Sequence, residues 1–279
     1  MRLYARPPVS ISHMERKVTA ALTGTVLEPS ELLFSVAVAE DADRVSEDFR
    51  ITVDGLDVQP TEVLAPGGSR LHLCRDVPPG ALSVFYSATV AGRSTPIEVT
   101  DLDEATYVRP SRYCESDRLA QVSYEEFGTL RGRELVVAVR DWVHKRLQYL
   151  SGSSRFTDGA VETYLARQGV CRDFAHLVIA LLRARGVPAR IASVYAPGLT
   201  PMDFHAVAEV ALDGTWEVVD ATERAPRQTL LRLATGRDAA DTAFLTTHHG
   251  QLRFGSVTVT AYAGSGLPAD DHRSPLSLG

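Results

Sequence analysis

The feature that most constrains the fold is a change of hydrophobic period about a third of the way along the chain. Up to about residue 92, short apolar runs alternate with polar residues, and turn-forming stretches such as Pro-Gly-Gly at residues 66–68 separate them. Alternation of this kind is typical of half-buried β-strands. In residues 135–147, apolar side chains recur at three- and four-residue intervals, which is typical of an amphipathic helix. We therefore predict an α+β protein in which strands precede helices.

The length of the chain, 279 residues, predicts two domains, because single domains usually contain roughly 100 to 200 residues. An irregular stretch at residues 98–114 marks the expected boundary. We assign residues 1–105 to an N-terminal β-sandwich, residues 106–263 to a second domain, and residues 264–279 to a flexible tail rich in Gly, Pro, Asp and Ser. In the second domain we expect the helix that begins near Cys171 to pack on an antiparallel sheet.

Composition argues against several classes of partner. The formal net charge of −6 would repel a phosphate backbone, and no basic stripe is interleaved with aromatic residues, so we do not expect nucleic acid binding. The apolar runs are too short for a secretory signal or a membrane span, and we therefore expect a cytoplasmic protein with no membrane partner. Nearly all of the positive charge is arginine, which suggests a bacterial source. Three cysteines are too few for a disulfide framework, and none forms a C-x-x-C pair.

Cys171 stands at the predicted start of a helix whose apolar face includes Phe174 and Leu181 and which ends before Gly186 and Pro188. At such a position, unpaired backbone N–H groups and the positive end of the helix dipole favour a thiolate over a thiol. A cysteine can also serve as a small buried apolar residue, and for an arbitrary cysteine that role is the more common one. The position at a helix start makes Cys171 a candidate nucleophile.

His205 and Asp220 are related by the geometry of a predicted β-hairpin. Asp-Gly at residues 213–214 is a strong signal for a two-residue turn, and this turn would place Val207 opposite Asp220. Because side chains alternate along a strand, His205 lies on the face of Val207 and is a diagonal neighbour of Asp220, about 7 Å away by backbone. A carboxylate that accepts from one imidazole nitrogen fixes the tautomer and leaves the other nitrogen for a thiol. The alternative is that His205 is a structural strand histidine that happens to lie beside an aspartate near a turn. The combination of this pair with a cysteine at a helix start favours the catalytic interpretation.

Three short motifs carry a family resemblance. They are Gly-Val-Cys-Arg-Asp-Phe-Ala-His at residues 169–176, Asp-Phe-His-Ala at residues 203–206 and Asp-Ala-Thr at residues 220–222. Together they resemble the catalytic motifs of bacterial transglutaminase-like cysteine proteases, whose N-terminal β-domain is similar in placement to residues 17–92. The chain departs from the usual pattern at two positions, since the family commonly has His-Ala-Trp and Asp-Pro-Thr where this chain has His-Ala-Val and Asp-Ala-Thr.

The resemblance implies a papain-like core in which Cys171 is the nucleophile, His205 the general base and acid, and Asp220 the orienting carboxylate. We expect acyl transfer on a peptide or amide substrate, without a cofactor or a metal, and a peptidase or amidase activity. Two alternatives stay open. An amine acceptor would make the protein a transglutaminase or an amide synthase, and a non-catalytic module could keep the fold for binding alone. The backbone N–H of Cys171 is the one oxyanion donor that the sequence identifies.

Other titratable residues and thiols are predicted to have structural roles. His176 follows Cys171 by five positions, so on a helix it points away from the thiol. His248 and His249 are adjacent and point apart, and no third ligand is evident, so we do not predict a metal site. The remaining residues that we expect to pack or to support a helix start are His144, Asp173, Cys74 and Cys114.

Overall fold

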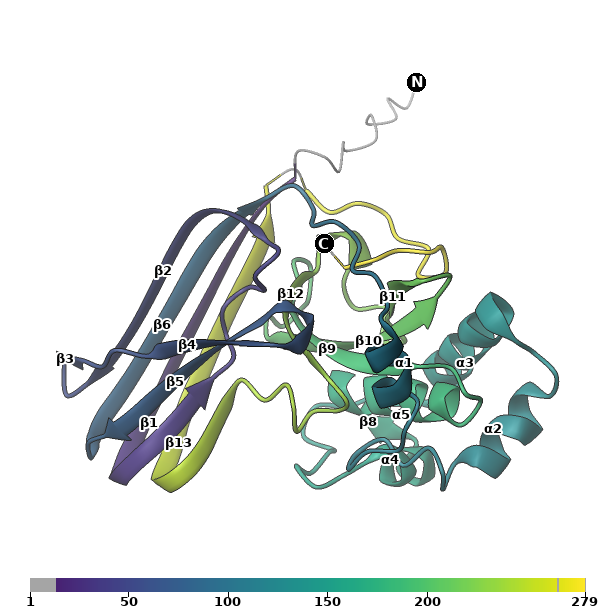
Figure 1. Ribbon diagram of the computed structural model, residues 1–279, viewed down its shortest axis with the longest axis horizontal. Coiled ribbons are helices and arrows are strands. Elements are labelled where there is room, and N and C mark those ends of the chain that lie inside the picture. Colours follow the sequence, from purple (N-terminus) through teal and green to yellow (C-terminus); the bar gives the residue numbers. More distant parts are fainter. Residues whose placement is uncertain (1–13, 265, 279) are drawn as a thin grey trace.

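The computed structural model describes residues 14–264 and 266–278 and confirms the α+β class, with strands first and helices next along the chain (Figure 1). Residues 1–13 of the predicted first domain lie outside the described residues. The first part of the chain contributes β1 (Glu15–Phe34), β2 (Asp43–Val53), β3 (Leu56–Asp57), β4 (Thr61–Ala65), the 3-10 turn η2 (Pro66–Gly68), β5 (Ser69–Val77) and β6 (Gly80–Ala91). The middle contributes α1 (Asp101–Tyr107), α2 (Ala120–Phe127), α3 (Gly132–Arg146), β7 (Gln148–Tyr149), α4 (Ala160–Ala166), β8 (Gln168–Gly169) and α5 (Cys171–Arg183). The last part contributes β9 (Ala189–Tyr195), β10 (Phe204–Leu212), β11 (Thr215–Val219), η3 (Arg227–Thr229), β12 (Leu231–Gly236) and β13 (Leu245–Ala263).

The N-terminal strands form one antiparallel sheet rather than the two packed sheets of a sandwich. Within the described residues its order is β3-β2-β6-β1-β5-β4, with β13 alongside β1. β6 pairs with the first part of β1, and β5 pairs with its last part. The long β1 therefore joins the two halves of the sheet, which has the form of a half-barrel. The layer that covers the buried face of this sheet comes in part from β9 and β12, through Tyr195, Leu231 and Leu233 (Figure 1). Two sheets therefore pack face to face, but the second one is formed by strands that follow the helices in the sequence.

β13 belongs to the N-terminal sheet, which corrects the predicted assignment of residues 245–263 to the second domain. It pairs antiparallel with β1, from Arg16 opposite Ala263 to Phe34 opposite Leu245. The two strands lie side by side although they come from opposite ends of the chain (Figure 1). Hydrophobic periodicity identifies a strand, but it carries no information about which distant strand will pair with it.

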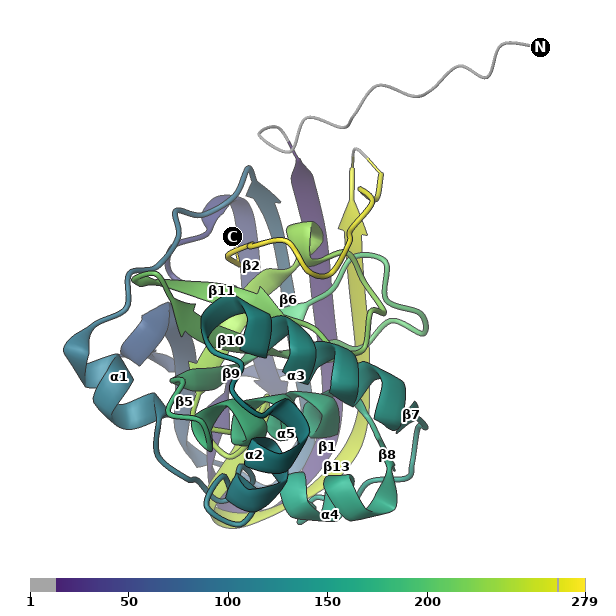
Figure 2. The ribbon, with the colours of Figure 1, turned by 90° about the vertical axis from the view of Figure 1, so that its right-hand side faces the viewer.

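The second layer of the molecule is a four-stranded antiparallel sheet of order β11-β10-β9-β12 with helices on one face (Figure 2). α5 packs against β9 and β10, and α2, α3 and α4 contact α5. As predicted, α5 begins at Cys171 and ends before Gly186, and it buries an apolar face that includes Leu177 and Leu181. Among the helices of the described residues, none has the length and apolar character needed to cross a membrane.

The segment predicted as a flexible tail is held against the second sheet over residues 266–278. The Asp270 carboxylate accepts hydrogen bonds from the Arg227 guanidinium, the shortest at 2.8 Å, and from the Arg227 backbone N–H at 2.8 Å. The Val218 N–H donates to the Leu276 carbonyl at 2.7 Å, and Leu278 is fully buried. A composition rich in Gly, Pro and Ser predicts fraying, but the ion pair and these contacts override it.

Candidate active site

Cys171 is the first residue of α5, and a local hydrogen bond fixes where this helix begins. The Asp173 carboxylate, one turn into the helix, accepts from the Val170 N–H at 2.8 Å, as the acidic residue of a capping box does. Gly169 permits this arrangement, since a Cβ at this position would lie 2.6 Å from the Asp173 Cβ. The Cys171 thiol is half-buried, at the end of the helix where backbone N–H groups lack intrahelical partners.

His205 and Asp220 lie side by side, as the hairpin register predicts. Leu212 pairs with Thr215 and Ala208 with Val219, so the turn at residues 213–214 has the expected two-residue length. His205 Nε2 lies 3.0 Å from Asp220 Oδ2, and both side chains are essentially fully buried. The sequence-based prediction of this contact is confirmed.

Asp220 is fixed on both of its oxygens. Its Oδ1 accepts from the Thr222 backbone N–H at 2.8 Å and from the Thr222 hydroxyl at 2.7 Å, which leaves Oδ2 for His205. Burial raises the pKa of Asp220, but the imidazole and the hydrogen bonds from His205 and Thr222 outweigh burial and hold this pKa below its ordinary value. Conversely, burial lowers the pKa of His205, yet Asp220 together with the Cys171 thiol raises it well above 6.5. The pair therefore favours an imidazolium beside a carboxylate.

The second imidazole nitrogen, Nδ1, is left over by the contact of Nε2 with Asp220. Among the described residues, no group makes a well-aligned hydrogen bond to the buried His205 Nδ1, while the Cys171 side chain lies close enough to raise the pKa of the imidazole. Both residues line one cavity of about 420 Å³. Loose contacts of this kind between a nucleophile and its base are common in unliganded sites and tighten when substrate binds. The arrangement allows a proton to pass between Sγ and Nδ1.

Tyr149 is a member of the site that the sequence did not reveal. It pairs in the short parallel β7–β8 ladder with Gly169, two residues before Cys171, and its hydroxyl interacts with the Cys171 backbone N–H. The Arg224 guanidinium lies over its ring, 4.4 Å from the centroid. Burial first, and the neighbouring thiol second, raise the pKa of Tyr149 to about 12, so the phenol keeps its proton at neutral pH. An O–H donor therefore lies beside the start of α5.

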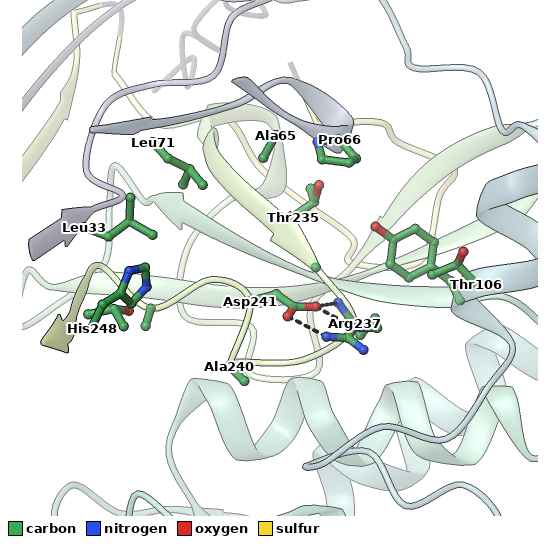
Figure 3. Close-up of a pocket in the computed structure, with 14 residues that line it drawn as sticks. Leu33, Ala65, Pro66, Leu71, Thr106, Thr235, Arg237, Ala240, Asp241 and His248 are labelled. Atoms are coloured by element: carbon green, nitrogen blue, oxygen red, sulfur yellow. Dashed lines mark hydrogen bonds and ion pairs between the residues drawn. The ribbon is translucent and has the colours of Figure 1, made fainter. Parts of the chain in front are cut away.

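A loop over residues 237–244 separates the cavity at Cys171 from a second one. The His176 imidazole accepts from the Ala239 N–H at 3.1 Å, which connects the loop to α5. The Asp238 carboxylate accepts from the Tyr113 N–H at 3.0 Å, which connects the loop to the segment between α1 and α2. Figure 3 shows the cavity on the far side, also about 420 Å³, where Arg237 and Asp241 form a bidentate ion pair. Cys171 and His205 do not line that second cavity.

Comparison with known proteins connects this geometry to a family. Residues 124–221, which include Cys171, His205 and Asp220, match the model of the transglutaminase-like superfamily. The solved structure named "Putative Cysteine Protease" from Cytophaga hutchinsonii has 32% sequence identity, covers 96% of this chain and 98% of that chain, and superposes with a TM-score of 0.85. The chain belongs to the transglutaminase-like superfamily. This membership confirms the resemblance inferred from the three sequence motifs.

Two mycobacterial relatives of this superfamily member are longer than this chain. An uncharacterised protein of Mycobacterium leprae is 27% identical over 202 residues, which are 69% of this chain and 66% of that protein. An uncharacterised protein of Mycobacterium tuberculosis is 33% identical over 141 residues, which are 50% of this chain and 35% of that protein. The chain therefore spans about two thirds of the first relative and about a third of the second.

The remaining candidates of the sequence analysis occupy structural positions in this superfamily member. His176 is buried and stacks on Tyr113 with ring centroids 5.5 Å apart, and burial lowers its pKa to about 3. His144 Nδ1 lies 3.0 Å from the Ala221 carbonyl, and His248 contacts Glu31. Cys74 and Cys114 are fully buried, and burial raises the pKa of both thiols. Within the described residues no group of three His, Cys, Asp or Glu side chains is arranged to hold a metal ion.

Proposed function

We propose that this protein is a cysteine-dependent enzyme that cleaves an amide bond, as a peptidase or amidase, with Cys171 as nucleophile, His205 as general base and acid, and Asp220 as the orienting carboxylate. The observation that carries the proposal is the buried His205–Asp220 pair, in which His205 also lines one cavity with a cysteine at a helix start. The likeness to the Cytophaga hutchinsonii structure supports the same class of reaction.

The proposed reaction begins with a thiolate. Transfer of the thiol proton from Cys171 to the His205 imidazole gives a thiolate that faces an imidazolium. Sγ attacks the amide carbonyl carbon, and the carbonyl oxygen becomes an oxyanion that the Cys171 N–H stabilises. His205 then donates its proton to the leaving amine, and the C–N bond breaks to leave a thioester. A water molecule, deprotonated by His205, hydrolyses the thioester and releases the acid.

The acceptor of the acyl group distinguishes the proposed activity from its alternatives. An amine in place of water would give a new amide, and the protein would then act as a transglutaminase or amide synthase. A non-catalytic binding module would not need a thiol, a base and a carboxylate together. The presence of all three residue types, with Cys171 and His205 lining one cavity and Asp220 bonded to His205, supports the catalytic alternative.

Thiol labelling and product analysis test the proposal. Iodoacetamide near neutral pH should modify Cys171 before Cys74 and Cys114, because the other two thiols are buried and their pKa values are raised. Mass spectrometry of tryptic peptides gives the order of modification. Peptide pools with and without added amines should then show cleavage products or new amides with the wild type and neither with Cys171→Ala. Equal labelling of the three thiols, or full turnover by folded Cys171→Ala, would refute the assignment.

A further inference from the structure

The cavity that contains Cys171 is walled by aromatic side chains. Phe204, at the start of β10, and Phe244, just before β13, stack with ring centroids 5.3 Å apart, and both line this cavity. Phe156, from the loop before α4, also lines it and is 91% exposed. An aromatic ring left in solvent at the edge of an apolar cavity is available to cover a bound group.

Small residues line the same cavity and leave space between the aromatic walls. Ser193 and Ala206 are paired neighbours on β9 and β10, and both line the cavity. Ala239, Ala240 and Ala243 do so from the loop at residues 237–244, together with Thr242. The resulting volume of about 420 Å³ falls within the range of roughly 300 to 1,000 Å³ that is typical of pockets for small ligands. A glycine or alanine side chain would fill little of it.

Charged side chains contribute little to the cavity. Besides His205, Arg172 is the charged residue among the described lining residues, and no Asp or Glu is among them. The Arg172 Nη2 is already bonded to the Ser154 hydroxyl at 2.6 Å and to the Arg155 carbonyl at 2.8 Å, and its Nε is buried. A cationic group would therefore lose hydration without gaining a carboxylate, and an anionic group would compete for a guanidinium that is held in place.

We infer that this cavity receives a bulky, uncharged, apolar side chain of the acyl donor, aromatic or branched aliphatic, next to the amide that Cys171 attacks. The inference rests on the proposed function, and it adds the substrate class. Aromatic walls, a small-residue lining and the lack of a lining carboxylate all favour the same kind of group. Burial of such a group against the stacked rings of Phe204 and Phe244 also brings the scissile carbonyl to a fixed position beside the thiol.

A set of matched electrophiles tests the inference. N-acetyl-aminoacyl vinyl sulfones carrying the side chain of Phe, Leu, Gly, Lys or Glu alkylate a thiolate. Sulfur bonds to the β-carbon of the vinyl group, and the proton from His205 goes to the α-carbon. Because pocket contacts discriminate side chains by about ten- to two-hundredfold, we expect Cys171 to react at least about tenfold faster with the Phe and Leu probes than with the other three. Equal rates, or a preference for the Lys or Glu probe, would overturn the inference.

A variant that fills the cavity tests whether this site sets the preference. Ala243→Phe should remove most of the advantage of the Phe probe over the Gly probe, measured as the ratio of the two rates within the variant, and its iodoacetamide rate reports whether Cys171 is still reactive. Ala105→Phe, on an exposed face of α1 and outside this cavity, is the matched control and should behave as the wild type. If Ala243→Phe loses the rates with the Phe probe, the Gly probe and iodoacetamide together, the variant is misfolded. Phe244→Ala then tests the inference, because it should slow the reaction with the Phe probe selectively.

Binding without chemistry separates this inference from the proposed function. Saturation-transfer NMR on Cys171→Ala should detect N-acetylphenylalaninamide and give a much weaker signal for N-acetyllysinamide. If iodoacetamide does not favour Cys171 in the wild type, the proposed function fails, and the NMR result still decides which side chain the cavity accepts. If labelling favours Cys171 but the two amides bind equally, the substrate class is wrong and the nucleophile stands.

Discussion

The His205–Asp220 pair makes the free energy of unfolding depend on pH in a defined direction. The pKa of His205 is raised to about 10, so its contribution to stability is fully present below its ordinary pKa of 6.5 and is lost as pH rises toward 10. Because the pKa of Asp220 is lowered, its contribution to stability is fully present above its ordinary pKa of 3.8. This contribution is lost as pH falls below that value. The pair therefore stabilises the fold most between these two ordinary values.

The first prediction uses Asp220→Asn to isolate this contribution. Removing one partner of a buried pair costs about 3 kcal/mol, so near pH 6 the variant should be less stable than the wild type by that order. The difference should shrink as pH rises toward 10, because the wild type itself then loses the imidazolium. Urea unfolding at pH 6, 8 and 9.5 measures it. A difference that is constant with pH would show that His205 does not hold its proton in the folded state.

The second prediction concerns the hydroxyl of Tyr149, which lies beside the Cys171 N–H and stays protonated. We expect Tyr149→Phe to lower kcat by about a hundredfold with little change in KM, since loss of one oxyanion donor costs this much. Alkylation by iodoacetamide forms no oxyanion, so its rate should not change. Tyr164→Phe, which keeps the ring stacked on Trp142, is the control. Equal kcat in Tyr149→Phe and the wild type would exclude the hydroxyl as a donor.

At the scale of elements, sequence predicts best what local chemistry decides. The Asp-Gly turn was predictable because both residues adopt positive φ angles, 51° at Asp213 and 80° at Gly214, which this dipeptide tolerates better than most. The start of α5 was predictable from an acidic residue in its first turn and an apolar stripe. Those two elements place Cys171, His205 and Asp220, and hence most of the site.

Elements that depend on distant partners could not be predicted in this way. β7 and β8 have two residues each, too few for a period, and the parallel pairing that brings Tyr149 to Cys171 leaves no pattern in the sequence. The loop at residues 237–244 lines the cavity at Cys171, and its contacts with His176 and Tyr113 hold it there. Both of these residues lie far away along the chain. Long-range packing therefore supplies the walls of the site.

The third prediction tests Gly169, the residue that lets α5 begin where it does. In Gly169→Ala the new methyl would overlap Asp173, so the carboxylate would leave the Val170 N–H and the start of α5 would shift. We expect a loss of stability of about 2 kcal/mol, in the range of overpacked sites, and slower alkylation of Cys171. Gly264→Ala, where a Cβ meets only ordinary contacts, is the control. An unchanged melting temperature and alkylation rate would show that the cap is not needed.

At the scale of the whole molecule, the last residues are held against the second sheet by several contacts, among them the Arg227–Asp270 ion pair. The fourth prediction is that Asp270→Asn weakens the hydrogen bonds to Arg227 and releases residues 266–278, at a cost of about 2 kcal/mol for bonds to a charged group. Trypsin should then cleave after Arg273 faster than in the wild type, as mass spectrometry can follow. Asp48→Asn, on an exposed part of β2, should leave the cleavage rate unchanged. If cleavage after Arg273 is equally fast in the wild type, the segment is not held by this pair.

The pairing of β1 with β13 also has a consequence for the order in which the protein is made. On a ribosome, β1 emerges among the first residues and gains β6 early, but the strand for its other edge follows more than two hundred residues later, as the register of Arg16 with Ala263 requires. At roughly 5 to 20 residues per second, the half-barrel keeps an unpaired edge for on the order of ten seconds or longer. An open edge of a twenty-residue strand can pair with the same edge of another nascent chain. Neighbouring chains on one messenger could therefore pair through this edge during synthesis, and the edge stays open until residue 263 has left the exit tunnel.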